Sequence, residues 1–228
     1  MSRKENVQTV KENICRAAQR AGRSPQDIQI VAVSKTFELP AIREVYEAGI
    51  RDFGENRAQE LRRKSEEFDG ACAWHFIGRL QTNKVRDVLG RAVLIHSLDR
   101  EELAQELQRR CERSALVCDA LVQVNVSAEQ TKAGVDPRDL PVFLKTLQRY
   151  SCIRIKGLMT IAPFTQEPEQ AREVFSRLRR LRDSLRGAYN DLTELSMGMS
   201  SDYCVAVEEG ATIVRIGSAV FGTRDAGE

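Results

Sequence analysis

The feature that most constrains the fold is an alternation of short apolar runs and amphipathic helix patterns, repeated eight times along the chain. The apolar runs are nearly continuous, which is typical of parallel strands buried on both faces of a sheet. Eight such units favour a closed (β/α)8 barrel, a fold of about 250 residues, over the alternative of a doubly wound open sheet. The predicted strands cover residues 28–34, 51–54, 72–78, 92–97, 119–126, 153–161, 192–196 and 212–216.

One further helix is predicted before the first strand. Residues 5–21 carry an apolar stripe at helical spacing, and Gly22 stands where a helix-ending glycine belongs. We see no linker or low-complexity stretch, and only six residues follow Gly222. We therefore expect one domain over residues 1–228, an α/β fold that is a single (β/α)8 TIM barrel with an extra N-terminal helix.

Charge and composition narrow the classes of function. Thirty-five Lys and Arg face 33 Asp and Glu, so the net charge of +2 argues against a dedicated nucleic-acid binder. No apolar run approaches the roughly 20 residues that span a membrane, and the N-terminus lacks a signal-peptide pattern. Six cysteines without a CxxC pair indicate reduced thiols, and two histidines argue against a His-rich metal site. We expect a soluble, cytoplasmic monomer.

Lys35 is the first candidate for chemistry. The active site of such a barrel forms at the C-terminal ends of the strands, and Lys35 directly follows the first strand. It shares a face with Val31 and Val33, so if these valines fill the barrel, Lys35 points into its mouth as an amine nucleophile. The alternative is a lysine that reaches out to solvent.

The last two strand ends add an anion site and a cation. Residues 196–202 and 217–222 are rich in serine and glycine, and the loops after strands seven and eight often bind phosphate in this fold. Alternatively, Ser201 merely caps a helix. Arg215 lies between apolar residues, where either a surface salt bridge or a ligand would be its partner. An amine, a phosphate site and an inward cation together indicate a phosphorylated aldehyde, with pyridoxal 5′-phosphate (PLP) first.

Three further features are compatible with a PLP site but do not by themselves indicate one. Asn56 follows the second strand, where its amide could donate to a ring oxygen or cap the next helix. His75 lies in the third strand, where a core histidine is the more common outcome. The polar loop over residues 129–134 could cover the barrel mouth or be a plain connection.

Six ordered motifs carry a resemblance to a known family. The sequence resembles the pyridoxal phosphate homeostasis protein family, whose fold is similar to the N-terminal barrel of alanine racemase. The similarity runs over nearly the full chain, and all six motifs lie at the ends of predicted strands. They are VAVSK at 31–35, FGEN at 53–56, WHFIGRLQTNK at 74–84, GLMT at 157–160, SMGMSSD at 196–202 and VRIGSAVFG at 214–222.

The resemblance implies roles for individual residues. Lys35 would hold PLP as an internal aldimine, and Arg215 would face the pyridine nitrogen. Ser218 stands where threonine is more usual, but the hydroxyl is retained. The candidate cofactor-binding set is therefore Lys35, Asn56, His75, Met199, Ser200, Arg215, Gly217 and Ser218, with Ser200, Gly217 and Ser218 at the phosphate.

The resemblance implies a PLP carrier in vitamin B6 homeostasis, without robust catalysis, whose transient recipients would be PLP-dependent apoenzymes. The alternative is a low-activity PLP-dependent racemase or lyase, which needs a proton-transfer group; of the four tyrosines, only Tyr203 falls near the predicted mouth. A Schiff-base aldolase using Lys156, in strand six, is a third hypothesis. A purely structural module is disfavoured because no exposed amphipathic stripe is evident.

Overall fold

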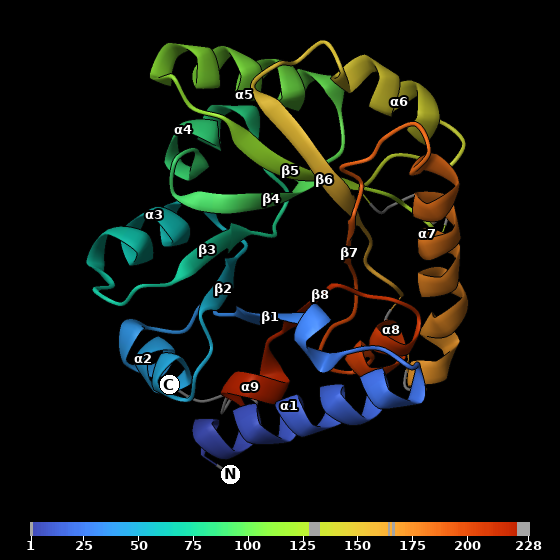
Figure 1. The fold of residues 1–228 in the computed structure, drawn as a ribbon. Helices are drawn as coiled ribbons and strands as arrows, with labels where there is room; N and C mark the ends of the chain where they lie inside the picture. The colour runs from blue at the N-terminus through green and yellow to red at the C-terminus, as the bar shows by residue number, and fades with distance from the viewer. Residues whose placement is uncertain (1, 128–132, 164, 166, 223–228) are drawn as a thin grey trace.

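In the computed structural model, eight parallel strands close into a barrel in which each strand pairs with the next and β8 pairs with β1 (Figure 1). The structure describes residues 2–127, 133–163, 165 and 167–222. Each predicted strand corresponds to one observed strand, so the closed barrel is confirmed and the open sheet was the wrong alternative. The strands are β1 Gln29–Val33, β2 Asp52–Glu55, β3 Ala73–Phe76, β4 Ala92–Leu98, β5 Cys118–Gln123, β6 Ile153–Met159, β7 Glu194–Ser196 and β8 Ile213–Ile216.

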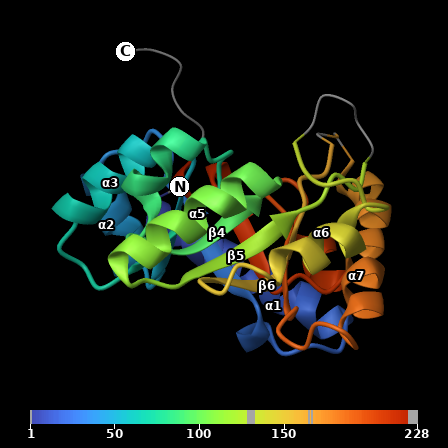
Figure 2. The ribbon, with the colours of Figure 1, turned by 90° about the horizontal axis from the view of Figure 1, so that it is seen from above.

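Helices surround the barrel, and Figure 2 shows two of them, α5 and α6, beside one another and in front of the strands. The helices are α1 Arg3–Arg20, α2 Leu39–Glu47, α3 Ala58–Glu67, α4 Val85–Val88, α5 Glu101–Ser114, α6 Leu140–Leu147, α7 Arg172–Leu185, α8 Tyr203–Glu208 and α9 Ser218–Phe221. Short 3-10 turns at Pro25–Asp27, Thr82–Lys84 and Pro168–Ala171 complete the elements.

The extra N-terminal helix is confirmed as α1, which packs against α8, α9 and α2 on the outside of the barrel (Figure 1). It begins with a capping box, in which the Ser2 hydroxyl accepts the Glu5 N–H and the Glu5 carboxylate accepts the Ser2 N–H. This exchange satisfies two backbone donors that a helix start otherwise leaves unpaired. The buried apolar residues of α1 thus pack between helices from the beginning and the end of the chain.

Strand five is shorter than predicted because the chain pairs with its own following loop. Val124 forms an isolated parallel bridge with Val135. The Asn125 N–H donates to the Val135 carbonyl, and the Val135 N–H donates to the Gln123 carbonyl. The apolar residues after Gln123 are therefore buried in a loop rather than in the sheet.

The core has an inner and an outer part. Inside the barrel lies a small apolar cluster with one residue from each of five strands, whereas a much larger cluster fills the space between strands and helices. Gly157 lets β6 approach β7, since a Cβ there would lie 2.0 Å from the Glu194 carbonyl oxygen. The inner cluster consists of Val31, Leu94, Leu121, Met159 and Ile213.

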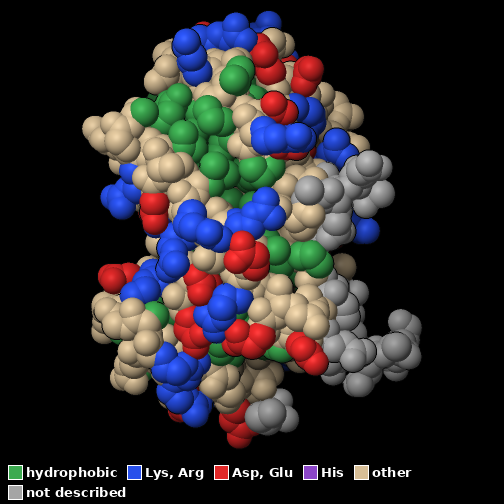
Figure 3. Space-filling view, turned by 90° about the vertical axis from the view of Figure 1, so that its right-hand side faces the viewer, with side chains coloured by type: hydrophobic (Ala, Val, Ile, Leu, Met, Phe, Trp, Pro, Cys, Tyr) green, Lys and Arg blue, Asp and Glu red, His purple; other side chains and the backbone are tan. Residues whose placement is uncertain are grey.

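The arginines of α7 are largely neutralised on the surface. Arg172 pairs with Glu208 at 2.6 Å and with Glu209 at 2.9 Å, and Arg180 pairs with Glu173 at 2.9 Å. Figure 3 faces this side and shows basic and acidic side chains interspersed next to a hydrophobic patch. Over the described residues, no helix combines the length and apolar character needed to cross a membrane.

Candidate functional site

A cavity of about 590 Å³ lies at the C-terminal ends of β1 and β8 and the loop after β7. This is the end of the barrel where the fold places active sites. Six of the eight candidate residues line it, so the structure brings together side chains that are up to 183 positions apart in the sequence. The lining comprises Val33, Lys35, Phe37, Met199, Ser200, Ser201, Arg215, Gly217, Ser218 and Gly222.

Lys35 reaches this cavity as the alternation of the strand predicts. Val31 packs in the inner cluster, and both Val33 and Lys35 line the cavity above it. Lys35 is exposed at the barrel mouth. The chain turns sharply immediately after it, because Thr36 adopts a φ of 66° in the left-handed region.

The serine-glycine segments form a cluster of hydrogen-bond donors. The backbone N–H groups of Gly217 and Ala219 both donate to the Ser200 hydroxyl oxygen, at 3.1 and 3.3 Å. Gly198 shapes this loop with a φ of 92°, and a Cβ there would lie 2.5 Å from the Ala206 Cβ. Two backbone donors thus converge on one oxygen atom at the cavity wall.

The interpretation of Ser201 as a helix cap is wrong. Helix α8 begins at Tyr203, and its N-cap residue is Asp202. The Asp202 carboxylate accepts the Met199 N–H at 2.6 Å, which closes the loop after β7. Ser201 is instead exposed and lines the cavity.

Arg215 is a buried cation, so the surface salt bridge was the wrong alternative. Its side chain donates to the Ser196 hydroxyl at 2.6 Å and to the Thr160 carbonyl at 2.9 Å. No acidic group forms an ion pair with it within the described part of the chain. Burial lowers the pKa of Arg215 to about 10, which leaves it charged at neutral pH. A buried charge of this kind attracts an anion or a lone pair.

Hydrogen bonds continue from Arg215 through the interior of the barrel. Ser196 Oγ lies 2.9 Å from His96 Nδ1, His96 Nε2 lies 3.0 Å from His75 Nδ1, and His75 Nε2 lies 3.1 Å from Asp52 Oδ1. Burial, together with the charges of His75 and Arg215, holds the pKa of His96 well below 6.5.

The neutral His96 fixes the direction of this chain of bonds. Arg215 can only donate to Ser196, so the Ser196 proton is free to point to His96. His96 then donates from Nε2 to His75, which donates to the carboxylate of Asp52. This run of hydrogen bonds thereby links Arg215 at the cavity to Asp52, the first residue of β2, which lies at the end of that strand away from the barrel mouth.

Two candidate residues lie elsewhere. His75 is buried inside the barrel as a member of this hydrogen-bonded chain and is not among the residues lining the cavity. Asn56 lines a different cavity, with Gly78 and Gln123 among its neighbours. Sequence reasoning missed Ser196 and His96, although Ser196 belongs to a motif and His96 shares strand parity with the inward Leu94.

The remaining sequence hypotheses can also be placed. Tyr203 is buried, and its hydroxyl accepts a hydrogen bond from Asn13 of α1 at 2.8 Å, which is a packing role. Lys156 is half-buried, lies where the register of β5 and β6 shifts, and is not among the residues that line the cavity of Lys35. Of the loop over residues 129–134, positions 129–132 lie outside the described residues.

This protein belongs to the class of alanine racemase-like barrels. The family model described as alanine racemase, N-terminal domain, matches residues 6–225. An alanine racemase structure from Clostridium difficile 630 shares the fold, with a TM-score of 0.75 at 14% sequence identity. That match covers 97% of this chain and 57% of the racemase chain.

More similar proteins define the family within this class. A pyridoxal phosphate homeostasis protein of Aquifex aeolicus is 48% identical over 222 residues, which cover 96% of this chain and 97% of that protein. The structure of PipY from Synechococcus elongatus with PLP bound has a TM-score of 0.80 at 38% identity, covering 92% of this chain and 100% of PipY. The chain belongs to the pyridoxal phosphate homeostasis protein family, as its six motifs predicted.

Proposed function

We propose that this protein binds PLP in the cavity at the barrel mouth, attaches it covalently to Lys35 and acts in PLP homeostasis as a carrier. The observation that carries the proposal is that one cavity is lined by a primary amine, a buried cation without an ion pair among the described residues, and three serines. The related PipY, which was solved with PLP bound, supports it.

The residues fit the three polar parts of PLP. Among the described lining residues, Lys35 is the one primary amine that could react with the aldehyde. The Gly217 and Ala219 N–H groups already converge on the Ser200 hydroxyl oxygen, an arrangement that suits a phosphate oxygen. Arg215 uses two of its five N–H donors inside the protein, so others remain for the ring nitrogen. Met199 and Ser218 complete the wall.

PLP, when bound, supplies an aldehyde carbon that a primary amine attacks, with formation of a C=N bond and release of water. Arg215 donates hydrogen bonds but accepts none, so it would keep the ring nitrogen unprotonated. An unprotonated ring withdraws electrons less strongly, which disfavours carbanion chemistry.

The cavity supports a carrier over an enzyme. Apart from Lys35, its described lining residues include no carboxylate, imidazole, phenol or thiol that could exchange protons with a substrate. Tyr203 is committed to Asn13. A racemase that works on both faces of a substrate carbon needs a second base, so a low-activity one-base racemase or lyase is the second candidate.

We further propose that the protein is a monomer, that PLP-dependent apoenzymes receive the cofactor and that the compartment is the reducing cytoplasm. All six cysteines are free, as such a compartment requires.

Solvent deuterium tests carrier against enzyme. The PLP-loaded protein is incubated with single amino acids in deuterated buffer, and deuterium at the α-carbon is measured by mass spectrometry. A carrier incorporates no more deuterium than free PLP does at equal concentration. Incorporation above that level, lost in Lys35→Ala, would establish the enzyme instead.

A further inference from the structure

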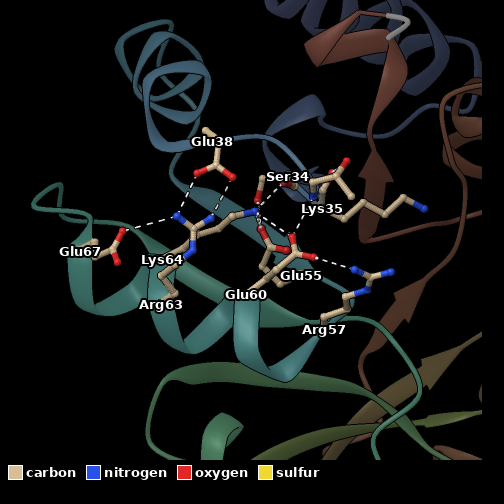
Figure 4. A network of polar contacts seen from close by, with 10 residues as sticks. Ser34, Lys35, Glu38, Glu55, Arg57, Glu60, Arg63, Lys64 and Glu67 are labelled. Atoms are coloured by element: carbon tan, nitrogen blue, oxygen red, sulfur yellow. Dashed lines mark hydrogen bonds and ion pairs between the residues drawn. The ribbon is translucent and has the colours of Figure 1, made fainter. Parts of the chain in front are cut away.

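A fully buried lysine lies directly behind the segment that carries Lys35. Lys64 of α3 has no exposed side-chain surface, and its Nζ lies 2.7 Å from Glu55 Oε1 and 3.3 Å from Glu60 Oε2. The same Nζ donates to the Ser34 carbonyl at 2.8 Å (Figure 4). Replacing a buried ion pair with apolar residues is often neutral or stabilising. A contribution to stability is therefore, by itself, a weak explanation for the presence of this buried ion pair.

Lys64, Glu55 and Glu60 also contact the two residues that flank Lys35 in the sequence. The Ser34 hydroxyl donates to Glu55 Oε1 at 2.6 Å, and the Thr36 N–H donates to Glu60 Oε2 at 2.9 Å. The backbone is therefore held on both sides of Lys35. Figure 4 shows the Lys35 side chain extending away from the cluster.

Thr36 shows what this restraint maintains. Its φ of 66° is unusual for a β-branched residue, and such a conformation persists only where the surroundings enforce it. Burial acts to raise the pKa of Glu60, but the Thr36 N–H and the Lys64 ammonium outweigh it and keep that pKa below its ordinary value. Glu60 is thus an ionised acceptor at neutral pH.

We propose that Lys64, Glu55 and Glu60 are positioning residues, which hold the backbone from Ser34 to Thr36 in the one conformation that directs Lys35 into the cavity. The inference rests on the proposed attachment of PLP to Lys35. The three residues act through the backbone, because none of them lines the cavity.

Two substitutions at one position separate positioning from overall stability. Glu60→Ala removes the acceptor of the Thr36 N–H, whereas Glu60→Gln retains an acceptor oxygen. Glu66→Ala is the matched control, since Glu66 lies on the same helix and pairs with Arg91 on the surface. The readouts are the hydrogen-exchange rate of the Thr36 amide without PLP, and the rate at which added PLP develops lysine-linked visible absorbance.

We expect Glu60→Ala to accelerate exchange at Thr36 and to slow attachment of PLP by about tenfold, the scale of one such backbone strain. Glu60→Gln should stay within about threefold of the wild type, and Glu66→Ala should match it. Ser34→Ala, which removes one hydroxyl contact and no charge, should slow attachment by a smaller factor and replaces Glu60→Ala if that variant does not fold.

Attachment at the wild-type rate in Glu60→Ala, with faster exchange at Thr36, would overturn the inference. An equal slowing in Glu66→Ala would also overturn it, because the effect would then be general. If the wild type develops no lysine-linked absorbance, the proposed function fails, while the exchange rate at Thr36 still reports on the restraint.

Discussion

Acid should destabilise the barrel through His96. The pKa of His96 in the folded protein lies well below 6.5 because the side chain is buried beside His75 and Arg215. An unfolded chain takes up a proton on this histidine near pH 6.5, whereas the folded chain does not. Stability is therefore retained above pH 6.5 and lost as the pH falls below it, with a slope approaching about 1.4 kcal/mol per pH unit.

The perturbation that isolates this effect is His96→Gln. A glutamine amide can accept from Ser196 and donate to His75 but does not titrate. Between pH 7.5 and 5.0, the wild type should lose up to about 2 kcal/mol of unfolding free energy through this one histidine. Because other titrating groups are common to both proteins, the difference between their pH dependences reports on His96.

Urea unfolding at the two pH values, followed by circular dichroism, measures that difference. The variant starts from a lower stability at pH 7.5, but it should lose less between pH 7.5 and 5.0 than the wild type does. Equal losses in the two proteins would refute the reasoning, because they would show that His96 takes up its proton in the folded state as readily as in the unfolded state.

Three further predictions concern stability and use thermal unfolding. Lys64→Met leaves the buried Glu55 without its partner and should cost about 3–5 kcal/mol, which lowers Tm by roughly 6–20 °C; a drop below 3 °C would contradict a tight buried pair. Gly157→Ala places a Cβ 2.0 Å from the Glu194 carbonyl, so β6 and β7 must separate at a cost of about 1–3 kcal/mol or more, and an unchanged Tm would argue against this close approach. Arg3→Ala breaks a surface pair with Glu44 and should cost less than about 1 kcal/mol; a loss as large as that of Lys64→Met would mean that exposure does not govern the strength of these pairs.

The strands and their inward faces were predictable because a buried parallel strand repeats with period two. That period places Val31, Lys35 and Arg215 on the inner side, and each is found there or lining the cavity. Because the eight repeated strands are parallel, their C-terminal ends all meet at the barrel mouth.

The polar interior was not predictable from local pattern. The contact between His75 and His96 depends on the register of β3 and β4, which shifts between Trp74 and His75. Lys64 follows the buried Ala58 and Leu61 at helical spacing, but a lysine on such a face usually extends its ammonium group to solvent, so the sequence did not predict that it is fully buried. Only the approach of α3 to Ser34 shows that this lysine is buried.

Covalent capture of PLP tests the central claim most directly. The purified protein is mixed with PLP, its visible spectrum is recorded, and borohydride then fixes any lysine-linked cofactor before digestion and mass spectrometry. The account predicts visible absorbance, a single modified peptide that carries Lys35, and loss of both in Lys35→Ala. Modification at another lysine, or absorbance that persists unchanged in Lys35→Ala, would contradict it.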